Sequence, residues 1–199
     1  MAHAVNGGGP AQRPEELEFR FVAGNRALDL LCTLGNRHLR RTERLAEPAD
    51  LDRWLGLAGL DVSEQARLRD LEDARNLREV VNRPTRGTLA GAAPAAEDLR
   101  ELNAWAARRA LAPQAAPSLE RRWVGEHAVR AALALVARDA VELLTSPERA
   151  LIRECAAAPH CSLLYLDRSR SGRRRWCEMG VCGSRAKMAS YRRRARRPG

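Results

Sequence analysis

The sequence predicts a mainly α-helical protein with a minor β component, and three observations lead to this prediction. Apolar residues recur three or four positions apart through most of residues 26–150, which is the spacing of one helix face. Four of the five cysteines lie within 28 residues near the C-terminus. Most of the net positive charge lies in that same region. We therefore expect a multihelical N-terminal domain followed by a small C-terminal module that needs a cross-link, such as a bound metal, to fold.

Length and composition indicate a globular protein of one large domain or two small ones. The chain has 199 residues, of which 45% are hydrophobic and 30% are charged. Its longest continuous apolar stretch, residues 131–137, is far below the ~18 residues needed to span a bilayer. Residues 1–14 lack the basic and apolar regions of a secretory signal. We therefore expect a cytoplasmic protein with reduced thiols and no membrane partner.

The first elements follow a leader that is rich in glycine and proline. Residues 1–14 are predicted to be disordered, because such a composition buries no apolar surface. Residues 19–22 mix apolar and charged side chains in near alternation, which predicts a short strand. A helix is expected over residues 26–39. A second helix is expected from an N-cap at Asp50 to a stop at Gly59.

Capping residues and prolines divide the next part of the chain. Ser63 can cap a helix that we expect to end before Arg83, since the residue that precedes a proline disfavours the α region. Residues 84–96 are rich in Pro, Gly and Ala and predict a linker. Another helix is expected over residues 99–110, and prolines end it.

The last part of the N-terminal domain carries the strongest amphipathic pattern of the chain. Residues 119–124 are predicted to be extended, with Trp123 buried. A long helix is expected over residues 129–143. A short helix should follow it at residues 146–148, where the order Ser-Pro-Glu supplies a cap and an N1 proline. The helical domain is thus predicted to cover residues 15–150.

The four clustered cysteines have the spacing C-x5-C-x15-C-x4-C. They are Cys155, Cys161, Cys177 and Cys182. Each pair comes from one local turn, and the connection can fold back between the pairs, which suits one tetrahedral Zn²⁺. Four cysteines leave no open position for water, so the metal should be structural. The alternatives are four unpaired thiols in a small apolar patch, or His160 as a competing ligand.

The connection and the C-terminus predict the shape of a treble clef. Residues 163–166 are expected to form one strand, residues 169–172 the turn, and residues 174–176 the return strand. A run without a helix breaker, residues 185–197, predicts a final helix that begins just after Cys182. The positive end of that helix would stabilise a thiolate. The expected fold is therefore a multihelical domain plus a treble-clef-like zinc finger of a β-hairpin and a helix.

Two stretches, CSLLYLDRS at 161–169 and RRWCEMGVCGSRAK at 174–187, carry a resemblance to the CGNR zinc finger. The N-terminal part is similar to the ABATE domain, which precedes that finger in bacterial proteins described as stress-induced transcription regulators. The residues that carry this second resemblance are Phe21, Leu28, Asp29, Leu30, Thr33 and Leu51 to Trp54. The resemblance implies a helical ABATE-like domain over 15–150, and over 151–199 a CGNR-type finger with four zinc ligands and a role in DNA binding.

Two positions depart from that family pattern. Ser184 stands where the family name has Asn. Ser keeps the function if the position caps the last helix, whereas a bidentate contact to a base would be lost if the Asn amide reads base edges. Cys32 stands where the N-terminal pattern more often has Asn. We interpret Cys32 as a small buried apolar residue, with a reactive thiol as the alternative.

The positive charge belongs to the C-terminal segment. From Arg168 onward there are 12 basic residues and one acidic residue, a net charge of +11, whereas the preceding residues hold 23 basic and 24 acidic side chains, a net charge of −1. Zinc with four thiolates carries −2, which lowers the total of the loaded chain from +10 to about +8. We expect Met188 and Tyr191 to pack back near Trp176. The predicted nucleic-acid contacts are Arg173, Arg174, Arg175, Arg185, Lys187, Arg192 and Arg193.

These features predict a DNA-binding transcription regulator that is associated with the nucleoid. Duplex DNA is favoured over RNA, because few aromatic residues are available for base stacking. The alternative is an RNA-associated or protein-interaction module in which zinc is only structural. A small-molecule ligand of the N-terminal domain is a weaker hypothesis. We expect no enzyme, since Asp29, His38 and His127 form no catalytic motif by their spacing.

Overall fold

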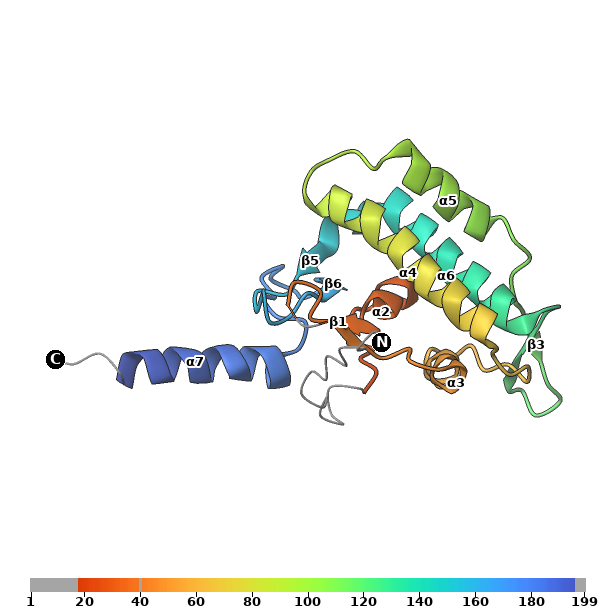
Figure 1. Ribbon diagram of the computed structural model, residues 1–199, viewed down its shortest axis with the longest axis horizontal. Coiled ribbons are helices and arrows are strands. Elements are labelled where there is room, and N and C mark those ends of the chain that lie inside the picture. The colour runs from red at the N-terminus through yellow and green to blue at the C-terminus, as the bar shows by residue number, and fades with distance from the viewer. Residues whose placement is uncertain (1–17, 40, 196–199) are drawn as a thin grey trace, which may run out of the picture.

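The computed structural model describes residues 18–39 and 41–195, and Figure 1 shows their arrangement. The predicted disordered leader, residues 1–14, lies outside the described residues. Helices dominate the structure, and the strands form only two-stranded antiparallel sheets. The prediction of a mainly helical fold with a minor β component is confirmed. In the part of the chain that the structure describes, no helix is long and apolar enough to cross a membrane.

The N-terminal part is built on three long helices that lie side by side (Figure 1). These are α4 (Leu68–Leu89), α5 (Ala96–Ala106) and α6 (Ala128–Thr145). The short helix α2 (Arg26–Leu31) packs against α4 and α6, and α3 (Pro48–Leu57) packs against α4. Their facing sides bury large side chains almost completely, among them Leu28, Trp54, Leu77, Leu102 and Leu133. Amphipathic spacing thus leads to one helical core, as the sequence predicted.

The prediction that a helix ends before Pro84 is wrong, because α4 continues through this proline to Leu89. Pro84 is buried, and a proline inside a helix removes one backbone hydrogen bond. Thr85 donates a hydroxyl hydrogen bond to the carbonyl of Val81 (2.7 Å), and Thr88 donates one to that of Pro84 (2.9 Å). Packing of α4 against α5 and α6 therefore outweighs the tendency of a proline to end a helix. The predicted linker over 84–96 shortens to residues 90–95.

The helix predicted over 26–39 ends early. After α2 the chain forms β1 (Leu34–Gly35), which pairs with β2 (Thr42–Glu43). A side chain at Gly35, the last residue of β1, would place a Cβ 2.6 Å from Nη1 of Arg44, so glycine leaves room for that guanidinium, which donates to the carbonyl of Cys32 (3.1 Å). The strand predicted over 19–22 is also absent, since residues 18–23 run without a ladder partner.

Three other helix boundaries differ from the prediction. Helix α3 begins at Pro48, and Asp50 occupies its third position, where its carboxylate accepts the N–H of Glu47 (3.0 Å) in a capping box. Helix α4 begins after Arg67 instead of after a Ser63 cap. Helix α5 spans Ala96–Ala106 instead of residues 99–110.

A hairpin of β3 (Ala112–Ala115) and β4 (Arg121–Val124) joins α5 to α6. Trp123 is half-buried and not fully buried as predicted, and its indole N–H donates to the carbonyl of Gly59 (2.5 Å). The long helix α6 is confirmed. The short helix after it is η1 (Pro147–Leu151), a 3₁₀ helix in which the Ser146 hydroxyl accepts the N–H of Glu148 (3.2 Å).

The C-terminal part contains β5 (Ile152–Glu154), β6 (Leu164–Leu166), a π-helical turn η2 (Met179–Gly183) and α7 (Ser184–Ala195). Strand β6 pairs with β5, so the predicted hairpin with residues 174–176 is wrong. Side chains hold this segment as a loop. The Asp167 carboxylate accepts the N–H of Arg174 (3.0 Å), and the Tyr165 hydroxyl donates to the Arg174 carbonyl (2.6 Å).

Helix α7 extends away from the rest of the molecule (Figure 1) and contains no buried residue. Met188 is 51% exposed and Tyr191 is 63% exposed, so the prediction that they pack back near Trp176 is wrong. Trp176 instead lies beside η2, 3.5 Å from the position that a Cβ of Gly183 would take. The turn of η2 directs α7 outward, which leaves its side chains available to a partner.

Candidate metal centre and the basic surface beside it

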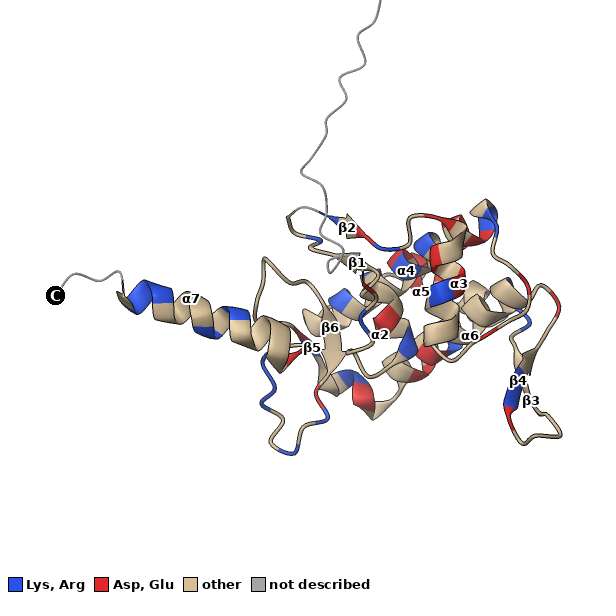
Figure 2. Ribbon diagram, turned by 90° about the horizontal axis from the view of Figure 1, so that it is seen from below, with Lys and Arg blue, Asp and Glu red and all other residues tan. Residues whose placement is uncertain are grey.

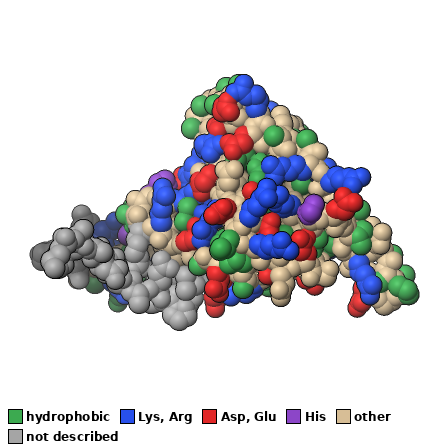
Figure 3. All heavy atoms as spheres, turned by 45° about the vertical axis from the view of Figure 1, so that its right-hand side comes forward, with side chains coloured by type: hydrophobic (Ala, Val, Ile, Leu, Met, Phe, Trp, Pro, Cys, Tyr) green, Lys and Arg blue, Asp and Glu red, His purple; other side chains and the backbone are tan. Residues whose placement is uncertain are grey.

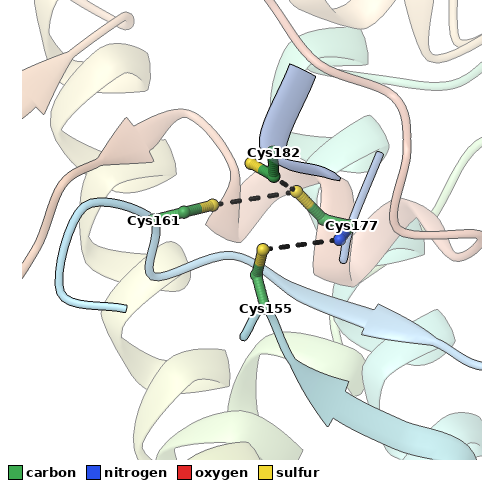
Figure 4. Close-up of side chains that lie close together, drawn as sticks. All are labelled: Cys155, Cys161, Cys177 and Cys182. Atoms are coloured by element: carbon green, nitrogen blue, oxygen red, sulfur yellow. Dashed lines mark hydrogen bonds between the residues drawn. The ribbon is translucent and has the colours of Figure 1, made fainter. Parts of the chain in front are cut away.

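Four cysteines from separate loops meet in the C-terminal part, as Figure 4 shows. Cys155 follows β5, Cys161 precedes β6, Cys177 precedes η2, and Cys182 lies within η2. All four side chains are buried, and their Sγ atoms lie within 4.8 Å of one another. The Sγ atom of Cys177 is 3.7 Å from that of Cys161 and 3.6 Å from that of Cys182.

These distances fit one zinc ion. A tetrahedron with Zn–S bonds of about 2.3 Å has sulfur–sulfur edges of about 3.8 Å. A disulfide would require about 2.05 Å, and all four cysteines are free thiols. His160 is exposed and is not part of the group, so it does not compete for the metal. The four cysteines are placed to bind one Zn²⁺ with a closed, structural shell, as predicted.

The ionisation of the cluster also calls for a cation. Hydrogen bonds from Cys161, Cys177 and Cys182 lower the pKa of Cys155 and favour its thiolate. Hydrogen bonding within the cluster and burial then raise the pKa of Cys177, since a second negative charge would lie beside the first. Four thiolates within 4.8 Å of one another in a buried site would repel one another strongly. Zinc supplies the positive charge that stabilises four thiolates together.

Backbone hydrogen bonds hold the ligands in place. The N–H of Cys155 donates to the carbonyl of Leu163 (3.0 Å), which joins the first ligand to the segment that leads into β6. The N–H of Cys161 donates to Ala157 (3.1 Å), and that of Cys182 donates to Glu178 (3.0 Å). The N–H of Cys177 points at Sγ of Cys155 (3.5 Å). Local turns thus position Cys161 and Cys182, whereas contacts between separate segments position Cys155 and Cys177.

Six of the seven predicted nucleic-acid contacts are exposed, on the loop before Cys177 and along α7. They are Arg173, Arg175, Arg185, Lys187, Arg192 and Arg193. Within residues 18–39 and 41–195, none of the six forms an ion pair with a carboxylate. Arg194, on the same helix, is exposed as well, and the sequence interpretation passed over it although it belongs to the same run. Figure 2 shows this basic end of the molecule in blue along α7 and the finger loops.

Arg174 differs from the other six because its guanidinium is used inside the fold. Its Nε donates to the carbonyl of Trp176 (2.9 Å), and its Nη2 donates to the carbonyl of Cys177. The same guanidinium lies 4.4 Å from the centre of the Tyr165 ring. Arg174 therefore supports the loop that carries the zinc ligand Cys177. Because its guanidinium is occupied within the fold, we no longer count Arg174 among the proposed nucleic-acid contacts.

Ser184 does not cap α7 from the preceding position. It is the first residue of the helix, and its hydroxyl donates to the carbonyl of Met179 (3.4 Å). Cys32 is buried in the helical core, and burial raises the pKa of its thiol to about 12. That environment fits the interpretation of Cys32 as a small apolar residue.

Sequence reasoning missed Arg20. This residue reaches from the N-terminal segment to the zinc site, where its Nη2 lies 2.5 Å from Oε2 of Glu178 and 3.9 Å from Sγ of Cys177. No spacing pattern joins residues 157 positions apart, so the contact required the fold.

A cavity of about 500 Å³ lies beside this contact, between the N-terminal segment and the finger. Arg20, Arg44, Cys161, Cys182 and Arg185 are among the residues that line it. The hypothesis of a small-molecule ligand for the N-terminal part stays a prediction, since the lining residues do not select one class of ligand.

Comparison with protein families divides the chain into two parts, with the boundary between residues 147 and 152. The profile of the ABATE family, described as a putative stress-induced transcription regulator, matches residues 24–147. The profile of the CGNR zinc finger matches residues 152–195. No match to a curated protein was found. The second range contains all four clustered cysteines and the whole of α7 as described.

Proposed function

Since this chain belongs to the ABATE family and ends in a CGNR zinc finger, we propose that it is a transcription regulator that binds duplex DNA through the finger. The observation that carries the proposal is the exposed basic surface on α7 and the finger loops, whose predicted contact residues form no ion pair with a carboxylate within the described residues. The zinc centre anchors this surface, because Cys182 lies in the turn that leads directly into α7. In this proposal the protein acts by binding, without catalysis, in the cytoplasm on the nucleoid.

The shape of α7 suits a duplex groove. The helix has 12 residues, and an α-helix with its side chains is about 10–12 Å in diameter, which the major groove of B-DNA, about 12 Å wide, admits. Arginine forks on the helix can bind phosphate oxygens or the O6 and N7 atoms of guanine. No residue of α7 is buried, and the basic side chains Arg185, Lys187, Arg192 and Arg193 are exposed to a partner.

The rest of the molecule offers a different kind of surface. Figure 3 shows a face of the helical part on which basic and acidic side chains are interspersed. In the helical part, ion pairs join basic and acidic side chains, such as Arg130 with Asp73 (2.5 Å) and Arg83 with Asp98 (2.5 Å). Basic side chains that already pair with acidic ones attract a polyanion only weakly. The charge distribution therefore favours the finger as the DNA-binding part.

Duplex DNA is favoured over single-stranded RNA by the aromatic residues of the finger. Base stacking needs exposed aromatic rings. Tyr165 is fully buried and Trp176 is half-buried, which leaves Tyr191 as the exposed ring in the described finger. One free ring is a poor platform for single-stranded bases.

Selection of bound fragments from a genomic DNA library by the zinc-loaded protein tests the proposal. A structured RNA competitor should be included, and a variant with Arg192→Ala and Arg193→Ala serves as the control. We expect enrichment of duplex fragments that the variant loses. Preferential loss of bound DNA to the RNA competitor would favour the RNA-associated alternative, and absence of any enrichment would refute DNA binding.

A further inference from the structure

Residues 18–24, here called the bridging segment, connect the helical part to the finger. Leu166, in β6, donates its N–H to the carbonyl of Ala23 (2.9 Å). Arg174 donates from the finger to the carbonyl of Val22 (3.4 Å). From the helical part, Nε of Arg44 donates to the carbonyl of Glu18 (2.8 Å). The bridging segment is thus held from both sides and lies against the zinc site.

Arg20 is the residue of the bridging segment that reaches the metal ligands. Its side chain is 18% exposed, and Cys177, toward which Nη2 points at 3.9 Å, is fully buried. Glu178 accepts a hydrogen bond from the same nitrogen at 2.5 Å and so fixes the direction of the guanidinium. Two contacts therefore hold a positive charge beside one sulfur of the cluster.

That charge has an electrostatic role once zinc is bound. A zinc ion with four thiolates carries a net charge of −2, and Glu178 adds another negative charge directly after Cys177. In a buried site such charges are poorly screened, so a nearby cation stabilises them. An N–H group that points at a thiolate also stabilises its charged form. Arg20 supplies both effects from outside the finger.

We propose that Arg20 is an outer-shell residue of the zinc site, so that the bridging segment helps to set the affinity of the finger for zinc. Residues 18–23 lie outside both matched family ranges, 24–147 and 152–195, so neither range alone contains the complete site. Outer-shell partners of metal ligands typically contribute about 10- to 100-fold to metal affinity. By thermodynamic linkage, zinc binding also stabilises the docking of the bridging segment against the finger.

The test compares zinc affinities of full-length variants by competition with a chromophoric chelator. Arg20→Met should raise the zinc dissociation constant about 10- to 100-fold. Arg20→Lys keeps the positive charge and should therefore raise the zinc dissociation constant less than Arg20→Met does. Arg168→Met is the matched control, because Arg168 also ties the bridging segment to the finger, through the carbonyl of Gly24 (3.0 Å). Its other partner is Glu148 (2.8 Å), so Arg168 contacts no zinc ligand. Because the bonds to Ala23 and Val22 still hold the bridging segment against the finger, the control should keep the zinc affinity of the unmodified protein.

A double-mutant cycle separates an effect on sulfur from a simple ion pair with Glu178. If Arg20 acts on the thiolate, Arg20→Met weakens zinc binding in the Glu178→Gln background as well. In the Co²⁺-substituted protein, loss of the nearby charge should move the sulfur-to-metal charge-transfer band to lower energy. Unchanged zinc affinity in Arg20→Met, equal losses in Arg20→Met and Arg20→Lys, or full recovery in Arg20→Met with Glu178→Gln would each overturn the proposal.

Discussion

The guanidinium of Arg86, on α4, donates a hydrogen bond to the carbonyl oxygen of Ser162, in the finger, over 2.9 Å. The same side chain pairs with Glu154, at the end of β5, over 3.0 Å. Ser162 directly follows the zinc ligand Cys161. The helical part therefore supports the loop between two ligands, and the apolar core continues from the helices into the finger.

Removing Arg86 should destabilise the protein. Arg86→Ala leaves the Ser162 carbonyl without its donor and Glu154 without a charged partner, which should cost on the order of 1–2 kcal/mol. Arg83→Ala is the matched control on the same helix, since Arg83 pairs with Asp98 and Glu101 at 43% exposure and should cost less than about 1 kcal/mol. Chemical unfolding of the zinc-loaded proteins measures both values. Equal costs would contradict a specific support of the finger by α4.

The protein should hold one zinc ion per chain. Cys177→Ser should lose the metal together with the structure of the finger, because three thiolates leave the shell incomplete. Cys32→Ala should retain the metal, since Cys32 is buried in the helical core outside the cluster. Elemental analysis and native mass spectrometry give the stoichiometry. A metal-free unmodified protein would refute the assignment.

Asp29 should make stability depend on pH. Burial raises the pKa of its carboxyl to about 6, against about 3.9 in an unfolded chain. The folded state therefore binds this proton more tightly, so Asp29 lowers stability as the pH rises from about 4 to 6, by on the order of 2–3 kcal/mol in total. Asp29→Asn should remove that dependence, so its stability relative to the unmodified protein should increase over this range.

Urea unfolding of both proteins at several pH values tests this expectation. The difference between them isolates Asp29, because the zinc ligands and other titrating groups are common to both. A difference that stays constant from pH 4 to pH 7 would show that the carboxyl titrates normally.

Arg174 and Arg175 are neighbours with opposite expected roles. Arg174→Met should lower the thermal stability of the finger, since it removes donors from the carbonyls of Trp176 and Cys177. Arg175→Met should nearly keep stability and weaken DNA binding, because Arg175 is exposed and its guanidinium contacts the fold through the Trp176 ring, 5.0 Å from its centre. Thermal unfolding and fluorescence anisotropy with labelled duplex DNA separate the two effects. The interpretation fails if both variants lose affinity equally at unchanged stability.

The zinc ligands and the strongest helices could be predicted from the sequence. Cysteine spacing limits which residues can meet around one ion, and the pattern of residues 129–143 is repeated over enough turns to identify α6. Pro84 shows the limit of such local rules. Its conformational penalty is local, whereas the burial that outweighs it comes from α5 and α6.

Contacts between distant segments could not be predicted. Strand β6 has two candidate partners in the sequence, and the choice of β5 depends on Asp167 and Tyr165, which hold residues 174–176 in a loop. The exposure of Met188 depends on the direction of α7, which η2 determines. Arg20 carries no motif at all, and only the folded chain brings it to Cys177.

The salt dependence of duplex DNA binding tests the central claim most directly. If the basic surface of the finger neutralises phosphates, the logarithm of the association constant should fall against the logarithm of salt concentration with a slope on the order of −4 to −7. Arg192→Ala with Arg193→Ala should make this slope shallower by about 2. Arg121→Ala with Arg122→Ala, an exposed basic pair on β4 far from the finger, should leave it unchanged (Figure 2). Binding that is absent or independent of salt in the zinc-loaded protein would contradict the account.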